Sequence, residues 1–268
     1  MNEHESRISP LVLQAGRMIL EARDVEATGQ VSEKAEDAAN LVTAYDKAVQ
    51  EYLVSALTAL YPDARFFAEE QENDTAVLSA PRCFVIDPID GTANFIHGLC
   101  RSSVSLAMLE EGVTVFGAVY DPYLDELYTA TLGGGAYLNG RRISVSGRTP
   151  QHAMTIFGTS PYQKERQGAN TFRLAERLYR KTRDVRRSGS AALDLAAIAA
   201  GRADIFFELS LSSWDVAAGL LLIREAGGTV TGLDGARPAL GEAAGVLAAN
   251  PACYGFLLDE ARAVLTDG

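Results

Sequence analysis

The sequence has few of the residues that mark exported, membrane or metal-finger proteins. Its only three cysteines are Cys83, Cys100 and Cys253, at spacings that match neither a disulfide framework nor a zinc site. We therefore expect reduced thiols and a cytoplasmic location. The polar start MNEHESRISP also lacks the basic and apolar segments of a signal peptide. No apolar run is long enough to cross a membrane, so no membrane association is expected.

Positive charge is also scarce. Lys and Arg number 24 against 35 Asp and Glu, which gives a formal net charge of -11. Because an acidic surface repels phosphates, general nucleic-acid binding is not expected. The exception is a basic stretch from Arg173 to Arg187. It is interpreted as a solvated helix face, with a subunit contact or an anion-docking surface as alternatives.

What the chain does have is a globular composition with clear helix signals near its start. Hydrophobic residues make up 47% of the 268 residues, enough for a sizeable core. Ser9 and Pro10 resemble an N-cap followed by a first helical residue, so a first helix is predicted to begin there. A second helix is predicted over residues 48–60, ending before Pro62.

Strands follow these helices. Apolar runs at 65–68 and 83–86 predict strands that each end at acidic residues, and turns between 103 and 146 predict an antiparallel meander. The second half predicts alternating elements at 154–157, 172–180, 185, 190–200, 204–208 and 214–226, then one strand and a terminal helix. The pattern indicates an α+β subdomain with the metal ligands at 1–147 and an α/β subdomain with a mixed sheet at 148–268, together one compact unit. The segment between Lys34 and the L-V-T sequence at 41–43 is expected to be irregular.

Residues 85–95, V-I-D-P-I-D-G-T-A-N-F, bring two carboxylates to the end of an apolar run. The proline between Asp87 and Asp90 fixes the backbone, so that both side chains can face one cavity. Gly91 permits close backbone approach, and a helix starting at Thr92 would aim its free N–H groups at the same place. This combination suits a phosphate held between metal ions and a helix terminus.

Three further carboxylates occupy similar positions: Glu69 follows a predicted strand, and Asp46 and Asp215 open predicted helices. Carboxylates without nearby Cys or His select hard divalent ions, so Mg²⁺ is expected, with Mn²⁺ as a substitute. Two or three such ions can activate water and stabilise a leaving oxygen, which indicates phosphoester hydrolysis. Each residue also has a local explanation: helix capping by Asp46 and Asp215, an Asx turn at Asp87, and a solvated loop at Glu69.

Four separated segments resemble motifs of the inositol monophosphatase family. Residues 85–95 resemble its D-P-[IL]-D-G-T signature, and F-A-E-E at 67–70 resembles its G-E-E element. L-V-T-A-Y-D at 41–46 is similar to its L-V-T-x-x-D element. W-D-V-A-A-G at 214–219, followed by E-A-G-G at 225–228, looks like its C-terminal signature. The resemblance spans nearly the whole chain.

The resemblance implies a layered αβαβα sugar-phosphatase fold and a Mg²⁺-dependent, Li⁺-sensitive homodimeric phosphatase. By position, the metal ligands would be Glu69, Asp87, the carbonyl of Ile89, Asp90 and Asp215. Thr92, paired with Asp46, would help to activate the attacking water, as would Glu69. The substrate contacts would be Asp90, Gly91, Thr92, Gly189, Ser190, Ala191 and Glu208. Arg186 and Arg187 would contact either an anionic substrate or a neighbouring subunit.

The expected substrate is a small phosphate monoester, with inositol 1-phosphate first because the N-F-I-H-G continuation looks like the inositol-phosphate branch. Histidinol phosphate, fructose 1,6-bisphosphate, NADP and 3′-phosphoadenosine 5′-phosphate are alternatives. Some bacterial family members act as RNA-polymerase or antitermination partners, so a surface function of the basic stretch is a second possibility.

The sequence departs from the family pattern at a few positions. Ala68, Ala93 and Asn40 replace residues that are usual in the family, but none of them is an expected metal ligand. His97 is interpreted as a structural residue and not as a general acid. The role of Lys34 stays open.

Overall fold

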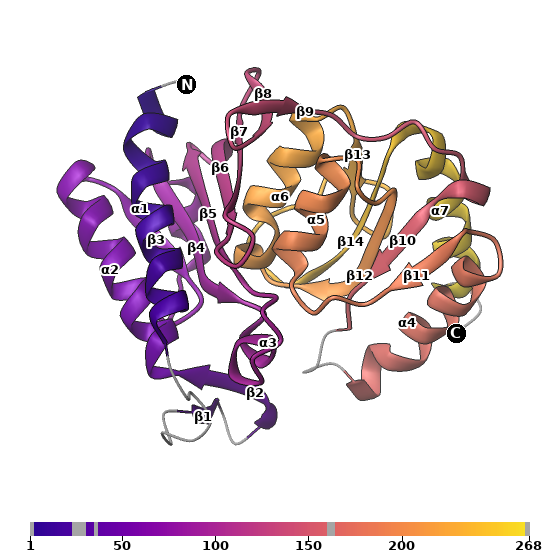
Figure 1. Cartoon of the computed structure of the whole chain (residues 1–268), viewed down its shortest axis with the longest axis horizontal. Helices are drawn as coiled ribbons and strands as arrows, with labels where there is room; N and C mark the ends of the chain where they lie inside the picture. The colour runs from indigo at the N-terminus through magenta and orange to yellow at the C-terminus, as the bar shows by residue number, and fades with distance from the viewer. Residues whose placement is uncertain (1–2, 23–30, 35–36, 160–163, 266–268) are drawn as a thin grey trace.

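Two large β-sheets alternate with three layers of helices in the described part of the chain, which also holds a two-stranded sheet (Figure 1). The computed structural model describes residues 3–22, 31–34, 37–159 and 164–265. None of the helices within these ranges has the length and apolar character that a bilayer crossing needs.

The larger sheet has seven strands in sequence order. They are β3 (Arg65–Ala68), β4 (Cys83–Asp90), β5 (Ser103–Glu110), β6 (Val113–Asp121), β7 (Glu126–Thr131), β8 (Gly135–Leu138) and β9 (Arg141–Ile143). Strands β3 and β4 are parallel, and every later pair is antiparallel. The predicted meander is therefore confirmed.

The smaller sheet is mixed, with the order β11-β10-β12-β14-β13. Its strands are β10 (Met154–Phe157), β11 (Asp184–Arg186), β12 (Ile205–Leu211), β13 (Thr229–Thr231) and β14 (Ala244–Ala249). A separate antiparallel pair joins β1 (Val31–Lys34) to β2 (Asp37–Thr43).

The helices are α1 (Glu3–Glu21), α2 (Ala44–Leu60), α3 (Thr92–Ile96), α4 (Lys164–Tyr179), α5 (Ala191–Ala199), α6 (Ser213–Glu225) and α7 (Pro251–Leu265). Helices α1 and α2 cover the outer face of the larger sheet, α5 and α6 lie between the sheets, and α4 and α7 cover the outer face of the smaller sheet (Figure 1). This αβαβα order is the predicted layered fold.

Strand β4 shows why the layers form. All eight of its residues are buried, and successive side chains point to opposite faces. Phe84 and Ile86 join the core under α1 and α2, whereas Cys83 and Val85 join the core between the sheets. A strand buried on both faces reads as a continuous apolar run, and this strand delivers Asp87 and Asp90 at its end.

Helix α6 lies close against the larger sheet. A Cβ at Gly117 in β6 would be 3.0 Å from the carbonyl oxygen of Ala218, so only glycine leaves room for the helix backbone. On the other side of α6, a Cβ at Gly219 would be 2.5 Å from Leu195 of α5. These contacts hold Asp215, in the first turn of α6, beside the end of β4.

Several local predictions were wrong. Helix α1 begins at Glu3 and carries Pro10 inside it, because Ile8 is fully buried upstream of the proline and extends the packed helix. The alanine-rich strand β14 was missed, since its residues have weak strand propensity. The loop after Lys34 was expected to be irregular, but residues from Asp37 onward form β2. The side chain of Lys34 lies outside the described residues.

The two sheets share no described strand, and the change from one to the other falls between Ile143 and Met154. The predicted boundary at residue 147 lies in this interval. Because α6 packs on both sheets, the division into subdomains stays a prediction.

Candidate active site

Three carboxylates from the two halves of the chain meet at one place. One oxygen from each of Asp87, Asp90 and Asp215 lies within 4.8 Å of the other two. Glu69 follows β3, and its N–H donates to the Ile86 carbonyl at 3.1 Å, which places it beside β4. These four residues are among the metal ligands expected from the sequence, and their role as ligands stays a prediction.

Asp87 and Asp215 each use one carboxylate oxygen for a hydrogen bond to a nearby backbone N–H. The Asp87 Oδ1 atom accepts from the Ile89 N–H at 3.0 Å, which is the Asx turn considered from the sequence. The Asp215 Oδ2 atom accepts from the Ser212 N–H at 2.7 Å and caps α6. Since each bond uses one oxygen, the structural explanation and metal binding do not exclude each other.

Asp90 is held differently, by the start of α5. Its carboxylate accepts from the hydroxyls of Ser190 and Ser103, the latter at 3.3 Å. It also accepts from the N–H groups of Ala191 and Ala192 at 3.2 and 3.0 Å. The positive end of the α5 dipole thus faces an aspartate of β4. Ser190 and Ala191 were predicted to contact substrate, and here they position Asp90.

Burial and mutual repulsion raise the pKa values of the cluster. The pKa of Asp87 lies well above its usual value because of burial first, and then the charges of Glu69, Asp90 and Asp215. Burial and the charges of Asp90 and Glu69 raise the pKa of Asp215 in the same way. Burial also raises the pKa of Asp90, against the lowering effect of its hydrogen bonds.

The donor set fits a hard divalent cation. Among the described residues, the group of possible metal ligands here consists of carboxylates without His or Cys, which suits Mg²⁺ or Mn²⁺ and not a soft metal. A bound cation would also offset the repulsion that raises these pKa values.

A hydrogen-bonded chain joins α2 to α3 beside the cluster. The Thr92 hydroxyl lies 3.2 Å from the Asp46 Oδ1 atom and 3.1 Å from the Ile89 carbonyl oxygen. The other oxygen of Asp46 accepts from the Thr43 N–H at 2.7 Å and from its hydroxyl at 2.5 Å. Asp46 therefore caps α2 with one oxygen and holds Thr92 with the other.

Gly91 is required at the start of α3. Its φ of 90° lies in the left-handed region, and a Cβ there would be 3.0 Å from the carbonyl oxygens of both Arg101 and Gly189. The N–H groups of Gly91 and Thr92 lie at the N-terminus of α3, where these segments pack closely. Two segments of the larger-sheet half and one of the smaller-sheet half thus meet at a single glycine.

Glu208 approaches the cluster from β12. It is buried, and its charge contributes to the raised pKa of Asp215. A Cβ at Gly158 would overlap the Glu208 carboxylate, so this glycine makes room for it.

The structure places Arg186 and Arg187, which are adjacent in the sequence, in different surroundings. A Cβ at Gly189 would be 3.2 Å from Arg187 Nη1, whereas exposed Arg186 pairs with Asp184 at 2.5 Å.

Sequence reasoning missed three residues that join the halves next to the cluster. The Asn94 amide donates to the carbonyls of Arg101 and Ser188 at 2.7 and 2.9 Å. The Arg101 guanidinium lies 3.9 Å from buried Asp194, whose carboxylate accepts from the Ser188 hydroxyl at 2.5 Å. The available signal was Asp194 itself, an acidic residue within a helix that is otherwise apolar.

Asp194 makes stability depend on pH. Burial, opposed by Ser188 and Arg101, raises its pKa from 3.8 to about 7. The folded state then holds a proton that the unfolded state has lost, so stability falls as pH rises from 3.8 to about 7. The effect is at most about 4 kcal/mol. Asp194→Asn should remove it and raise the free energy of unfolding above pH 7, measured by urea denaturation across pH.

The control for this prediction is Asp259→Asn, the same change at an exposed position of α7. It should leave the pH dependence as in the parent chain. An Asp194→Asn variant whose stability falls as steeply with pH as the parent's would contradict the prediction.

Comparison with known proteins agrees with this geometry. The model of the inositol monophosphatase family matches residues 4–266. A Mesorhizobium japonicum protein named inositol-1-monophosphatase is 38% identical, with 85% of each chain covered. The Nus factor SuhB of Pseudomonas aeruginosa is also 38% identical, over 91% of this chain and 90% of that protein.

Solved structures give the same result. An IMPase from Thermotoga maritima superimposes with a TM-score of 0.86 at 31% identity, covering 100% of this chain and 99% of its own. The inositol monophosphatase from Anabaena has a TM-score of 0.81 at 32% identity, with 95% and 93% covered. With the sequence motifs, the layered fold and these relatives in agreement, the chain belongs to the inositol monophosphatase family.

Proposed function

We propose that this family phosphatase hydrolyses a small phosphate monoester with the help of Mg²⁺, and that inositol 1-phosphate is its substrate. The observation that carries the proposal is the meeting of Asp87, Asp90 and Asp215 within 4.8 Å, next to Glu69. A purely structural role gives no reason to bury carboxylates that repel one another. The name of the Mesorhizobium japonicum relative supports the choice of substrate.

Each residue has a defined part in the proposed reaction. Glu69, Asp87, the Ile89 carbonyl, Asp90 and Asp215 would hold the divalent ions. When bound, such ions supply positive charge that acidifies water and neutralises the phosphate. The Thr92 hydroxyl donates a hydrogen bond to Asp46, so the lone pairs of the Thr92 oxygen would be free to orient the attacking water. Glu69 would take up the proton that this water releases.

Substrate binding would use the segments around the cluster. The N–H groups of Gly91 and Thr92, at the start of α3, would receive phosphate oxygens. Gly189, Ser190, Ala191 and Glu208 would face the hydroxyl-bearing part of the substrate, next to Arg187. We also propose a cytoplasmic homodimer, as the family resemblance implies.

A panel of phosphate esters tests the substrate. With Mg²⁺, the highest kcat/KM is expected for inositol 1-phosphate, and lower values for histidinol phosphate, fructose 1,6-bisphosphate, NADP and 3′-phosphoadenosine 5′-phosphate. Released phosphate is measured for each purified compound. A dominant rate on the adenosine bisphosphate would overturn the choice of substrate but not the phosphatase proposal.

Asp215→Asn tests the metal site in two ways. Loss of an anionic ligand should lower turnover more than about 100-fold at every Mg²⁺ concentration. Because the raised pKa of Asp215 reflects an unfavourable buried charge, the metal-free variant should melt at a higher temperature than the metal-free parent at neutral pH. Mg²⁺ should then stabilise the parent more than the variant.

The control is again Asp259→Asn, which should change neither turnover nor the response to Mg²⁺. Normal turnover of Asp215→Asn would show that the ligand assignment is wrong. A lower melting temperature of its metal-free form would show that the carboxylate serves the fold.

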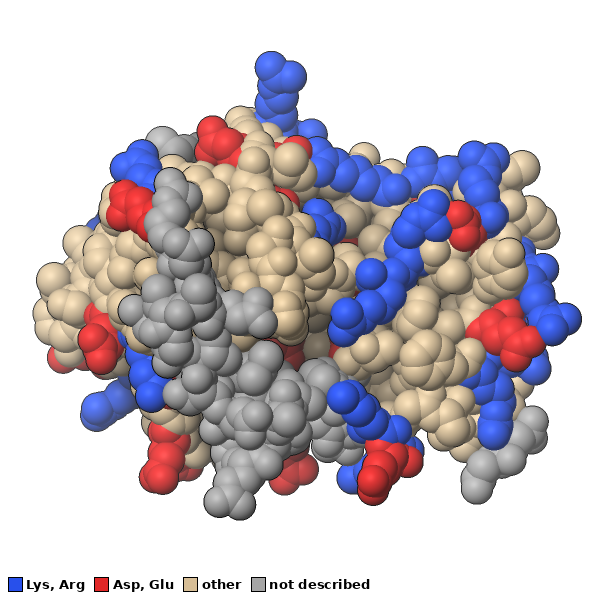
Figure 2. Space-filling model, turned by 60° about the horizontal axis from the view of Figure 1, so that its bottom comes forward, with Lys and Arg blue, Asp and Glu red and all other residues tan. Residues whose placement is uncertain are grey.

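A second function, as a protein partner in antitermination, is favoured by the relatives named Nus factor SuhB. Figure 2 shows many Lys and Arg side chains on its right-hand side, over the C-terminal half of the chain. Within the basic stretch, Arg177 and Lys181 pair with Glu260 at 2.9 and 2.6 Å and hold α4 to α7. Arg180 and Arg183 are exposed and are the better candidates for a partner contact.

Charge reversal tests this second function. Arg180→Glu with Arg183→Glu should abolish retention of RNA polymerase in a pull-down from cell extract and leave phosphatase turnover unchanged. The matched control is Arg65→Glu with Arg141→Glu, at two exposed positions on β3 and β9. Equal retention by both double variants and the parent would count against the surface role.

A further inference from the structure

Helix α2 carries two polar side chains on the face that packs against the larger sheet. Asp46 and Gln50 are four residues apart, so they lie on the same side of the helix, one turn from each other. Asp46 is fully buried, and Gln50 is only 7% exposed. The other buried residues of α2 are the apolar Val49, Leu53 and Leu57, which join the core under α1 and α2. Buried polar groups are therefore confined to the end of this helix that lies beside the carboxylate cluster.

Gln50 hydrogen-bonds the turn that follows β3. Its Oε1 atom accepts from the Glu70 N–H at 2.8 Å. The preceding amide, that of Glu69, donates to the Ile86 carbonyl of β4 at 3.1 Å. Two successive amides are thus tied to different elements. Because peptide groups are planar, the orientations of these two fix both φ and ψ of Glu69, and with them the direction in which its side chain leaves the backbone.

The Glu69 carboxyl lies against the carboxylate cluster. Burial raises the pKa of Asp87 most, and the charge of Glu69 comes next, together with a hydrogen bond between the two side chains. The charge of Glu69 also adds to the raised pKa of Asp215, after burial and the charge of Asp90. A change in the backbone angles of Glu69 would therefore move a group that is in contact with the cluster.

The same helix also holds Thr92. The Thr92 hydroxyl donates to the Asp46 Oδ1 atom at 3.2 Å, one turn before Gln50. Asp46 thus reaches α3, and Gln50 reaches the turn after β3. Because an α-helix is a rigid element, the distance between these two contacts is fixed by the helix geometry. Helix α2 therefore sets the position of Glu69 relative to Thr92.

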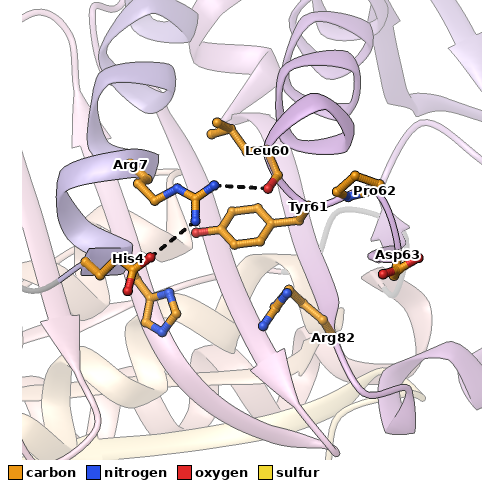
Figure 3. A pocket seen from close by; sticks show the side chains of 8 residues that line it. His4, Arg7, Leu60, Tyr61, Pro62, Asp63 and Arg82 are labelled. Carbon is orange, nitrogen blue, oxygen red and sulfur yellow. Dashed lines mark hydrogen bonds and ion pairs between the residues drawn. The ribbon is translucent and has the colours of Figure 1, made fainter.

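The far end of α2 is anchored to α1 and to the residue before β4 (Figure 3). Arg7 of α1 donates to the Leu60 carbonyl at 3.1 Å. The guanidinium carbons of Arg7 and Arg82 lie 4.7 and 4.9 Å from the centre of the buried Tyr61 ring, which directly follows the helix. Cation–π contacts of this kind hold the helix end in place. Since α2 is fixed at both ends, it can act as a rigid frame for the groups that Asp46 and Gln50 hold.

We propose that Gln50 is a positioning residue for water activation. Through the Glu70 amide it holds Glu69 in the orientation in which Glu69 can take a proton from the water that Thr92 orients. The inference rests on the proposed function, in which Glu69 and Thr92 act on the same water. A misplacement of about 1 Å can lower a rate about 100-fold, so the loss of one hydrogen bond at this turn has a measurable effect on turnover.

Gln50→Leu tests the proposal, because it removes the acceptor oxygen and leaves a good helix former of similar size. In the metal-free chain, the Glu70 amide should exchange with deuterium several-fold faster than in the parent, measured by mass spectrometry on the peptide that covers residues 67–73. With Mg²⁺ and the best ester of the panel, kcat should fall about tenfold or more, whereas KM should stay within about twofold, because Gln50 is not part of the substrate-binding segments.

Two further variants separate positioning from a structural role. Gln50→Glu keeps an acceptor oxygen and should keep both the slow exchange and most of the parent's kcat. Gln14→Leu, the same change at a partly exposed position of α1, should behave as the parent does. Parent-like kcat in Gln50→Leu, a fall in kcat without faster exchange at Glu70, or an equal fall in Gln50→Glu would overturn the inference and leave the phosphatase proposal standing. A parent chain that hydrolyses no ester of the panel would instead contradict the proposed function, and this inference with it.

Discussion

Repulsion between buried carboxylates is the constraint around which this molecule is organised. Burial raises the pKa values of Asp87, Asp90 and Asp215, and neighbouring carboxylates raise those of Asp87 and Asp215 further. Because these carboxylates repel one another, the packing of the surrounding strands and helices must hold them close together. This packing is provided by β4, which is buried on both faces, and by α6, which lies close to the larger sheet at Gly117. A divalent cation is the natural complement to what the fold has assembled.

Hydrogen bonds from backbone N–H groups let the same aspartates serve in local structure and in metal binding. Asp46, Asp87 and Asp215 each bind a nearby N–H with one oxygen, which fixes the side chain before any ion arrives. Pre-oriented ligands lose less conformational entropy on binding than flexible ones. The local role of these aspartates is therefore part of the proposed function and not an alternative to it.

Local motifs explain which parts of the structure the sequence could predict. The strand that begins at Cys83, the turn at its end and the helix start at Thr92 were predicted because an apolar run, a proline and a glycine lie side by side. The hydrogen bonds from α5 to Asp90 were not, because they join residues about a hundred positions apart and follow from packing between sheets. At Pro10 the effect is the opposite. The local pattern predicted a helix start there, but burial of Ile8 extends the helix upstream of the proline. The link from Asn94 to Ser188 likewise has no local pattern.

The two ends of α2 and the larger sheet have opposite chemistry. Carboxylates gather where β3 and β4 end and α2 begins, and Arg7 and Arg82 flank Tyr61 where α2 ends and the strands begin. The carboxyl end of the α2 dipole is negative, and Arg7 donates a hydrogen bond to its last carbonyl, that of Leu60. Arg7 and Arg82 flank the buried Tyr61 ring, and each of them also pairs with a carboxylate, Glu3 and Glu110 respectively. No sequence motif could reveal this contact, because Arg7, Tyr61 and Arg82 meet only after α1, α2 and β4 have packed.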